Sequence, residues 1–124
     1  MPPRKIALAA EAEARIDRVW DPHVAGDVNE SQVKVAKIGP AFDWHAHPEE
    51  DEAFLVLRGR MALDFRDGSV EMDEGDFLVV PRGTEHRPRA LTDRPIVAMF
   101  EPASTLNTGD AVGSRLTVAE LKRL

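Results

Sequence analysis

The chain has 124 residues, of which 43% are apolar and 31% charged, and it carries a net charge of −6 at pH 7 without a single cysteine. This length suits one globular domain, so residues 1–124 are expected to form one unit. The acidic balance without a basic cluster excludes a nucleic-acid partner. No apolar stretch approaches the length of a membrane span, and nothing requires an oxidising compartment. A cytoplasmic protein is therefore expected.

The N-terminal region predicts one amphipathic helix over residues 6–20, because apolar residues recur there at steps of three and four. Asp21-Pro22 should end this helix, since a residue before proline disfavours helical angles. His23 then lies in a predicted loop without a partner in any motif, which indicates a surface histidine, and residues 26–31 are expected to form a turn. The apolar run Ile6–Ala10 is shorter than the roughly 7–15 residues of a signal peptide core.

The middle of the chain alternates short apolar runs with turn residues, a pattern typical of β-strands. Strands are expected at 32–38, 52–57, 60–65, 69–72, 77–80 and 96–100. Asp67-Gly68 is a strong hairpin signal, and the run 77–80 is apolar throughout, so it should be buried on both faces. Several short strands at close spacing predict an all-β barrel or sandwich whose core spans about 32–101.

The tail, residues 102–124, shows no clear periodicity until 116–124. There Thr117 and Glu120 have the spacing of a capping box, in which the two side chains close the first turn of a helix. The sequence therefore predicts a short C-terminal helix.

Three histidines and one glutamate stand out as candidate metal ligands. His45 and His47 are two residues apart, and residues at that spacing share one face of a strand. Glu52 begins the next apolar run, and His86 follows a Pro-Arg-Gly turn. Three imidazoles with one carboxylate and no thiolate suit a divalent transition metal such as Mn, Fe, Ni or Zn. Such a set leaves open positions for water or a substrate.

These residues form two spaced motifs. The first reads G-x5-H-x-H-x4-E-x6-G from Gly39 to Gly59, and the second reads G-x5-P-x-G-x2-H from Gly75 to His86. In this order they resemble the two signature motifs of the cupin family. The resemblance implies a small antiparallel β-barrel of the jelly-roll type, a homodimer, and metal ligation by His45, His47, Glu52 and His86. One departure is Ala90, where the second motif usually ends in asparagine.

The segment 102–110 also resembles the tail of a group of small single-domain cupins that is often likened to mannose-6-phosphate isomerase. That likeness lies in the fold and is a weak guide to activity.

The first functional hypothesis is a metal-dependent enzyme that acts on a small organic molecule, sugar-like or carboxylate. Iron would favour a dioxygenase, whereas manganese, nickel or zinc would favour an isomerase or a hydrolase. No further general base shares the face of the histidines, so no catalytic residue beyond the metal ligands is assigned. Candidate substrate contacts by strand parity and position are Phe54, Arg58, Met61 and Phe77.

Two other hypotheses stay open. The first is a non-catalytic module that binds a small ligand or only the metal in a mostly apolar pocket. The second concerns assembly: Phe42 and Trp44 alternate with the histidines, so they should face away from the metal and form an apolar patch. Such a patch would serve a homodimer.

Overall fold

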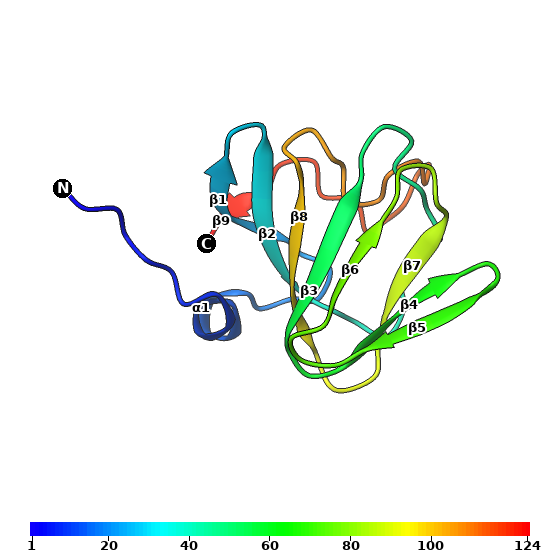
Figure 1. Cartoon of the computed structure of the whole chain (residues 1–124), viewed down its shortest axis with the longest axis horizontal. Coiled ribbons are helices and arrows are strands. Elements are labelled where there is room, and N and C mark those ends of the chain that lie inside the picture. The colour runs from blue at the N-terminus through cyan, green and yellow to red at the C-terminus, as the bar shows by residue number, and fades with distance from the viewer.

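The protein is described here by a computed structural model that covers residues 1–124. Two β-sheets face each other (Figure 1), one of six strands in the order β6-β3-β8-β2-β1-β9 and one of three in the order β5-β4-β7. The strands are β1 (His23–Val28), β2 (Ser31–Lys37), β3 (Glu52–Arg58), β4 (Met61–Phe65), β5 (Gly68–Met72), β6 (Phe77–Val80), β7 (His86–Ala90), β8 (Ile96–Pro102) and β9 (Lys122–Arg123). The predicted all-β jelly roll is confirmed, although the two sheets are not joined into a closed barrel.

The core lies between the two sheets and follows the alternation of the strands. Glu52, Phe54 and Val56 all point inward from β3, as their shared parity predicted, and each is at most 3% exposed. Met61 and Leu63 of β4 meet them from the opposite sheet and are fully buried. Phe54 belongs to this cluster and its ring centroid lies 6.3 Å from that of His86, so Phe54 borders the end of the core that holds the histidines.

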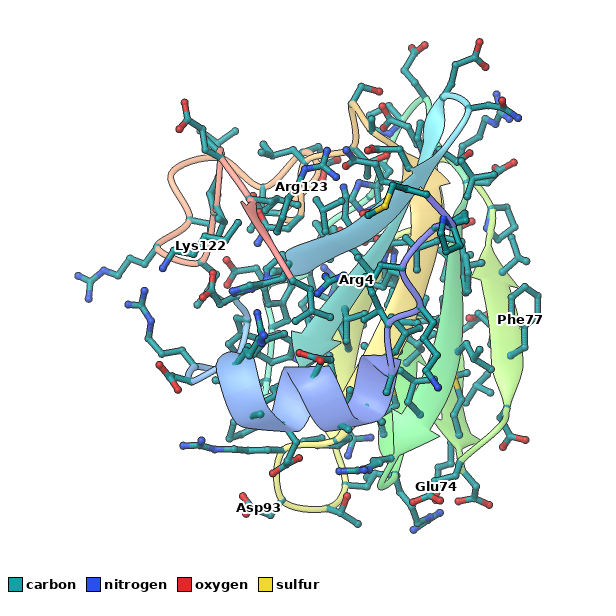
Figure 2. All side chains as sticks on the ribbon, turned by 90° about the vertical axis from the view of Figure 1, so that its left-hand side faces the viewer. Arg4, Glu74, Phe77, Asp93, Lys122 and Arg123 are labelled. Atoms are coloured by element: carbon teal, nitrogen blue, oxygen red, sulfur yellow. The ribbon has the colours of Figure 1, made fainter.

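The N-terminal helix is shorter than the periodicity predicted. Helix α1 spans Leu8–Arg15 and lies on the outer face of the large sheet (Figure 2). Ile16 turns to extended angles and is buried against Val35 and Ile96, and the chain then pairs Val19 with β2. Burial of Ile16 and this strand pairing therefore override the helical pattern of residues 16–20. No helix of the structure is long and apolar enough to cross a membrane.

Two predictions near the chain ends are wrong. Residues 23–28 form strand β1 instead of a loop and a turn, and His23 is only 6% exposed. The predicted C-terminal helix is absent, because Thr117 bonds the Thr108 hydroxyl and the Val118 amide donates to Asn107. These long-range bonds compete with a helix cap, and the chain ends instead as β9, parallel to β1.

Strand β6 is not buried on both faces as expected. It forms one edge of the large sheet, where Val80 points inward and is 2% exposed. Phe77 points outward and is 60% exposed (Figure 2), and Val79, which shares its parity, is 48% exposed. An edge strand covered on one side only leaves alternate residues open, whatever their hydrophobicity.

Phe42 and Trp44 do not form the apolar patch expected on the far side of the histidines. Phe42 is 7% exposed and packs against Trp20 and His45, with ring centroids 4.6 and 5.3 Å away. Trp44 is half-buried beneath the guanidinium of Arg66, which lies 3.9 Å from the ring centroid. The prediction failed because residues 42–47 are not a regular strand, so the two-residue alternation does not apply.

A buried carboxylate fixes the small sheet at the strand that carries His86. Asp64 of β4 accepts hydrogen bonds from the Nε atoms of Arg87 and Arg89 at 3.1 and 3.0 Å, and from the Ser69 hydroxyl at 2.6 Å. The Arg89 bond is the largest cause that lowers the pKa of Asp64, so this carboxyl stays ionised. These contacts hold β7 in register beside β4.

Candidate metal centre

The four predicted ligands come from three separate segments that the fold brings together. His45 and His47 lie on an irregular segment before β3, Glu52 is the first residue of β3, and His86 is the first residue of β7. All four are at most 3% exposed. One ligand atom from each lies within 4.8 Å of the others. The structure thus unites every residue of the predicted set.

The histidine segment, the irregular stretch that carries His45 and His47, is not part of a regular strand, and a few backbone hydrogen bonds fix its position instead. His45 and His86 exchange two bonds, from each amide to the other's carbonyl, at 3.0 and 2.8 Å. The Gly83 amide donates to the His47 carbonyl at 2.9 Å. These bonds link the first motif to the second, so the spacing of both motifs is needed to place the imidazoles.

The tail fixes the same segment from the other side. The Ala46 amide donates to Asp110 Oδ1 at 2.8 Å, and the Asp110 amide donates to the Ala46 carbonyl at 3.0 Å. Gly109 adopts a φ of +52°, and a Cβ atom there would lie 2.3 Å from the Ala46 oxygen. A side chain therefore has no room at Gly109, which explains glycine at this position.

The ring nitrogens of two histidines are oriented by carbonyls two residues earlier. His45 Nδ1 lies 2.8 Å from the Asp43 oxygen, and His86 Nδ1 lies 2.8 Å from the Thr84 oxygen. A carbonyl can only accept, so each Nδ1 carries the proton and each Nε2 is left as a free lone pair. This is the usual arrangement behind a metal-bound imidazole.

The donor set fits a divalent ion. The Nε2 atoms of His47 and His86 lie 3.3 and 3.4 Å from Glu52 Oε1. Two ligand atoms that each bind one ion at about 2.1 Å, in directions at right angles, would lie about 3 Å from each other. His47 makes no hydrogen bond through either ring nitrogen although it is 2% exposed. A buried imidazole without a partner is unfavourable, and a metal ion would satisfy it.

The charge states also suit a metal. Burial lowers the pKa of His45 to about 4, so its imidazole is neutral near pH 7. Burial by itself would raise the pKa of Glu52. The neighbouring Glu101, His47 and His86 side chains outweigh that effect and hold this pKa well below its usual range. A neutral imidazole and an ionised carboxylate are the forms that bind metal.

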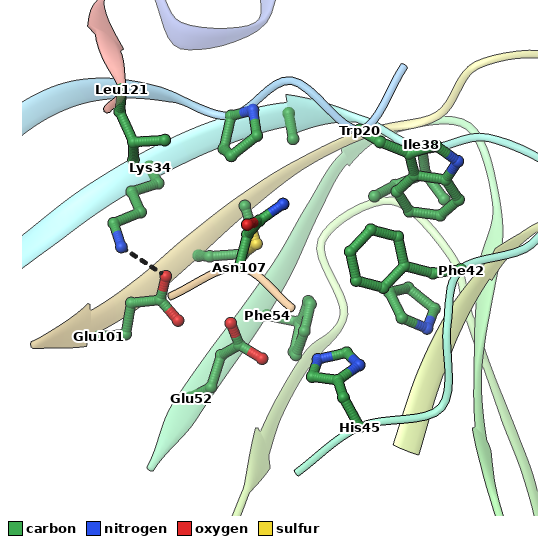
Figure 3. A pocket seen from close by; sticks show the side chains of 14 residues that line it. Trp20, Lys34, Ile38, Phe42, His45, Glu52, Phe54, Glu101, Asn107 and Leu121 are labelled. Carbon is green, nitrogen blue, oxygen red and sulfur yellow. Dashed lines mark ion pairs between the residues drawn. The ribbon is translucent and has the colours of Figure 1, made fainter. Parts of the chain in front are cut away.

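A small, partly open cavity lies beside the ligands His45 and Glu52 (Figure 3). Its wall is mostly apolar and includes Trp20, Phe42 and Phe54, so the open side of the metal site faces a space suited to a small molecule.

Of the predicted substrate contacts, only Phe54 lines this cavity. Met61 is part of the closed core, and Phe77 lies on the outer face of β6. Arg58 ends β3 on the outside, with its guanidinium 3.8 Å from Glu13. Strand parity indicates which face of a sheet a residue occupies. It does not indicate which end of the core the residue reaches.

Sequence reasoning missed two charged residues in the cavity wall, Lys34 and Glu101. They are 2% and 4% exposed, and Lys34 Nζ lies 2.8 Å from Glu101 Oε1. Burial and the neighbouring Glu52 carboxylate raise the pKa of Glu101 well above its usual range. The available signal was parity: Lys34 alternates with Val33 and Val35, and Glu101 continues the inward positions of β8.

Comparison with known proteins identifies the family. The family model described as Cupin domain matches residues 32–100, more than half of the chain. The chain belongs to the cupin family. Two solved structures are each 31% identical to this chain. A cupin-2 domain containing protein from Shewanella frigidimarina has a TM-score of 0.72, and the match covers 76% of this chain and 91% of that one. Protein NMB1881 from Neisseria meningitidis has a TM-score of 0.70, and the match covers 81% of this chain and 100% of that one.

Curated relatives are similar over only part of their own length. Uncharacterized protein YdbB of Bacillus subtilis is 40% identical over 65 residues, which are 52% of this cupin and 58% of YdbB. The acireductone dioxygenase of Puccinia graminis is 29% identical over 100 residues, which are 76% of this cupin and 52% of that enzyme. The chain spans only about half the length of the curated relatives it matches.

Proposed function

We propose that this cupin is a metal-dependent enzyme that acts on a small organic oxygen compound. The observation that carries the proposal is the buried cluster of His45, His47, Glu52 and His86 at the inner end of an apolar cavity. The similarity to a protein named acireductone dioxygenase supports an enzyme of this broad kind.

The roles of the residues follow from their placement. A divalent ion held by the four ligands supplies a Lewis acid for an oxygen donor, and iron adds reactivity toward dioxygen. The carbonyls of Asp43 and Thr84 fix the imidazole rings, and Glu52 supplies the one negative charge among the ligands. Trp20, Phe42 and Phe54 exclude water from the cavity and orient the apolar part of a substrate.

The alternative is a cupin that binds a small ligand or the metal without turnover. The same cluster and cavity support it, because both proposals use the same contacts. Only chemistry on a bound compound separates the two.

Turnover by metal-loaded protein is the test. We expect the wild type loaded with Fe(II) to consume oxygen, or the Mn, Ni or Zn form to isomerise or hydrolyse its substrate, in a screen of small hydroxy-carbonyl and carboxylate compounds. Glu52→Gln keeps the shape of the side chain but removes its charge, so turnover should fall at least about 100-fold. Ligand binding without turnover for every metal would favour the non-catalytic alternative.

We also propose that the protein forms a homodimer through the outer face of the large sheet. Two rows of paired residues cross four strands there, Val33–Phe100–Ala53–Val79 and Val35–Ala98–Leu55–Phe77, and all are apolar. Helix α1 covers Val35 but leaves Phe77, Val79 and Phe100 at least 36% exposed.

A second copy is the partner that suits this outer apolar patch. The two rows contain no charged side chain, so two copies can meet there about a two-fold axis without charge repulsion across the contact. Sedimentation should show a dimer for the wild type and a monomer for Phe77→Glu. The control is Val112→Glu, because Val112 is also exposed to solvent but lies outside the patch. A wild-type monomer at all concentrations would contradict the proposal.

A further inference from the structure

Trp20 lines the cavity in a backbone conformation that bulky residues rarely adopt. Its φ is +61°, in the left-handed region, where the Cβ of any residue other than glycine is crowded by a carbonyl oxygen. The surrounding chain holds it there, since the Trp20 amide donates to the Lys37 carbonyl at 3.0 Å and the preceding Val19 pairs with Lys37. Unfavourable backbone angles that a fold maintains are concentrated at binding and catalytic sites, so Trp20 is a candidate for a role in the cavity.

Two contacts fix the position of the Trp20 indole. A Cβ atom on Gly39 would lie 2.6 Å from the indole Nε1, so the ring occupies the space that a side chain at position 39 would need. The Phe42 ring packs against the indole with centroids 4.6 Å apart, and the His45 imidazole packs against Phe42 at 5.3 Å. Figure 3 shows all three rings in the wall of the cavity. The indole therefore ends an aromatic row that begins at a candidate metal ligand.

The part of the wall that the tail contributes is also fixed. Asn107 lines the cavity, and its carboxamide donates to the Leu116 carbonyl at 2.8 Å and accepts from the Val118 amide at 2.9 Å. Leu121 adds an apolar side chain to the same cavity (Figure 3), and Phe54 closes it from the core at 2% exposed. A close-packed wall of this kind does not yield to a ligand larger than the space it leaves.

We propose that Trp20 sets the size limit of the substrate, because its indole fills the space into which a larger body would extend from the metal. The substrate class is then a small oxygen compound with a short aliphatic body, and aromatic compounds are excluded. This inference deepens the proposed function and rests on its metal centre. Selection of this kind works through a steric clash with the wrong compound, so removal of the indole should broaden selection without abolishing binding.

The test compares two ligands that share one metal-binding group, acetohydroxamic acid with a methyl body and benzohydroxamic acid with a phenyl body. Both are titrated calorimetrically into the Zn(II)-loaded protein. We expect acetohydroxamic acid to bind the wild type at least about tenfold more tightly, because the phenyl ring would overlap the indole. Equal affinities, tighter binding of benzohydroxamic acid, or binding of neither compound by zinc-loaded protein would overturn the inference.

Trp20→Gly is the variant that isolates the indole. Glycine adopts left-handed angles without strain, which offsets part of the lost packing, so the fold should persist. Benzohydroxamic acid should bind this variant at least about tenfold more tightly than it binds the wild type, whereas the affinity for acetohydroxamic acid should change less than about threefold. Trp20→Phe keeps a smaller ring against Phe42 and should show a gain of about threefold, so the test does not depend on the glycine variant alone. Variants that hold zinc and still reject benzohydroxamic acid would show that Trp20 does not set the limit.

Trp44→Phe is the control and supplies a direct readout. Trp44 does not line the cavity, and its ring lies 3.9 Å from the Arg66 guanidinium, so the preference for acetohydroxamic acid should stay as in the wild type. Because the chain has two tryptophans, Trp20 is then the only source of tryptophan fluorescence. Acetohydroxamic acid should change this emission as it binds beside the indole. Unchanged emission at saturation would contradict the proposed position of the ligand.

The zinc content of each preparation separates this inference from the proposed function. A wild type that takes up no metal would overturn the metal centre itself. A zinc-loaded wild type without preference between the two hydroxamic acids would overturn only the role of Trp20.

Discussion

His47→Ala should lower the affinity for a divalent transition metal by more than about 100-fold, since the loss of groups that merely support a ligand already costs about 10–100-fold. The wild type should hold near one equivalent, bound by His45, His47, Glu52 and His86. Elemental analysis of dialysed protein and competition with a chelator measure the difference. His47 is the most informative of the four, because neither of its ring nitrogens has a hydrogen-bond partner within the protein.

The control for this substitution is His23→Ala. His23 is also buried, at 6% exposed, but its ring bonds the Asp21 carbonyl outside the cluster. The His23→Ala substitution should therefore leave the metal content of the protein unchanged. A second readout is stability: metal at 100 times its Kd should stabilise the wild type by about 2.7 kcal/mol and His47→Ala by far less. Equal metal content in wild type and His47→Ala would contradict the ligand assignment.

Gly109→Ala should destabilise the protein by about 3 kcal/mol and weaken metal binding as well. The positive φ of +52° by itself costs a residue with a side chain about 1–2 kcal/mol. The added Cβ would lie 2.3 Å from the Ala46 oxygen and 3.0 Å from His45 Cδ2, so the tail must move away from the histidine segment. Overpacking of this kind costs a further 1–3 kcal/mol or so. Urea unfolding and metal titration measure the two effects.

Gly113→Ala is the matched control. Gly113 also has a positive φ, +69°, but no atom lies within 4 Å of a Cβ built there. This variant should therefore lose only about 1–2 kcal/mol and bind metal as the wild type does. Similar losses in both variants would show that the contact between the tail and the histidine segment does not support the site.

Much of the fold could be predicted from local pattern. Strand β3 alternates so regularly that the inward direction of Glu52 and Phe54 followed from parity, and six strands were expected close to where they lie. The family followed from the spacing of the two motifs, whose match covers residues 32–100. These features are encoded by neighbours in the chain, because side-chain direction in a strand depends only on position along it.

The parts that local pattern predicted wrongly are those where a distant segment competes. Residues 16–20 have helical periodicity, yet Ile16 is buried against the sheet and Val19 pairs with β2. Thr117 has a capping-box partner in the sequence, yet it bonds Thr108 instead. Phe77 is as apolar as a core residue, but β6 is an edge strand and leaves it exposed.

By itself, the sequence determined the all-β class, the cupin motifs and the identity of the four candidate ligands, because each depends on residue type and short spacing. Tertiary structure alone decided how those ligands converge and what surrounds them. Lys34 and Glu101 are 67 positions apart in the chain and become partners only because β2 pairs with β8. Gly109 supports His45 only because the tail returns to it. Contacts between distant segments are set by packing of the whole chain, which no local pattern records.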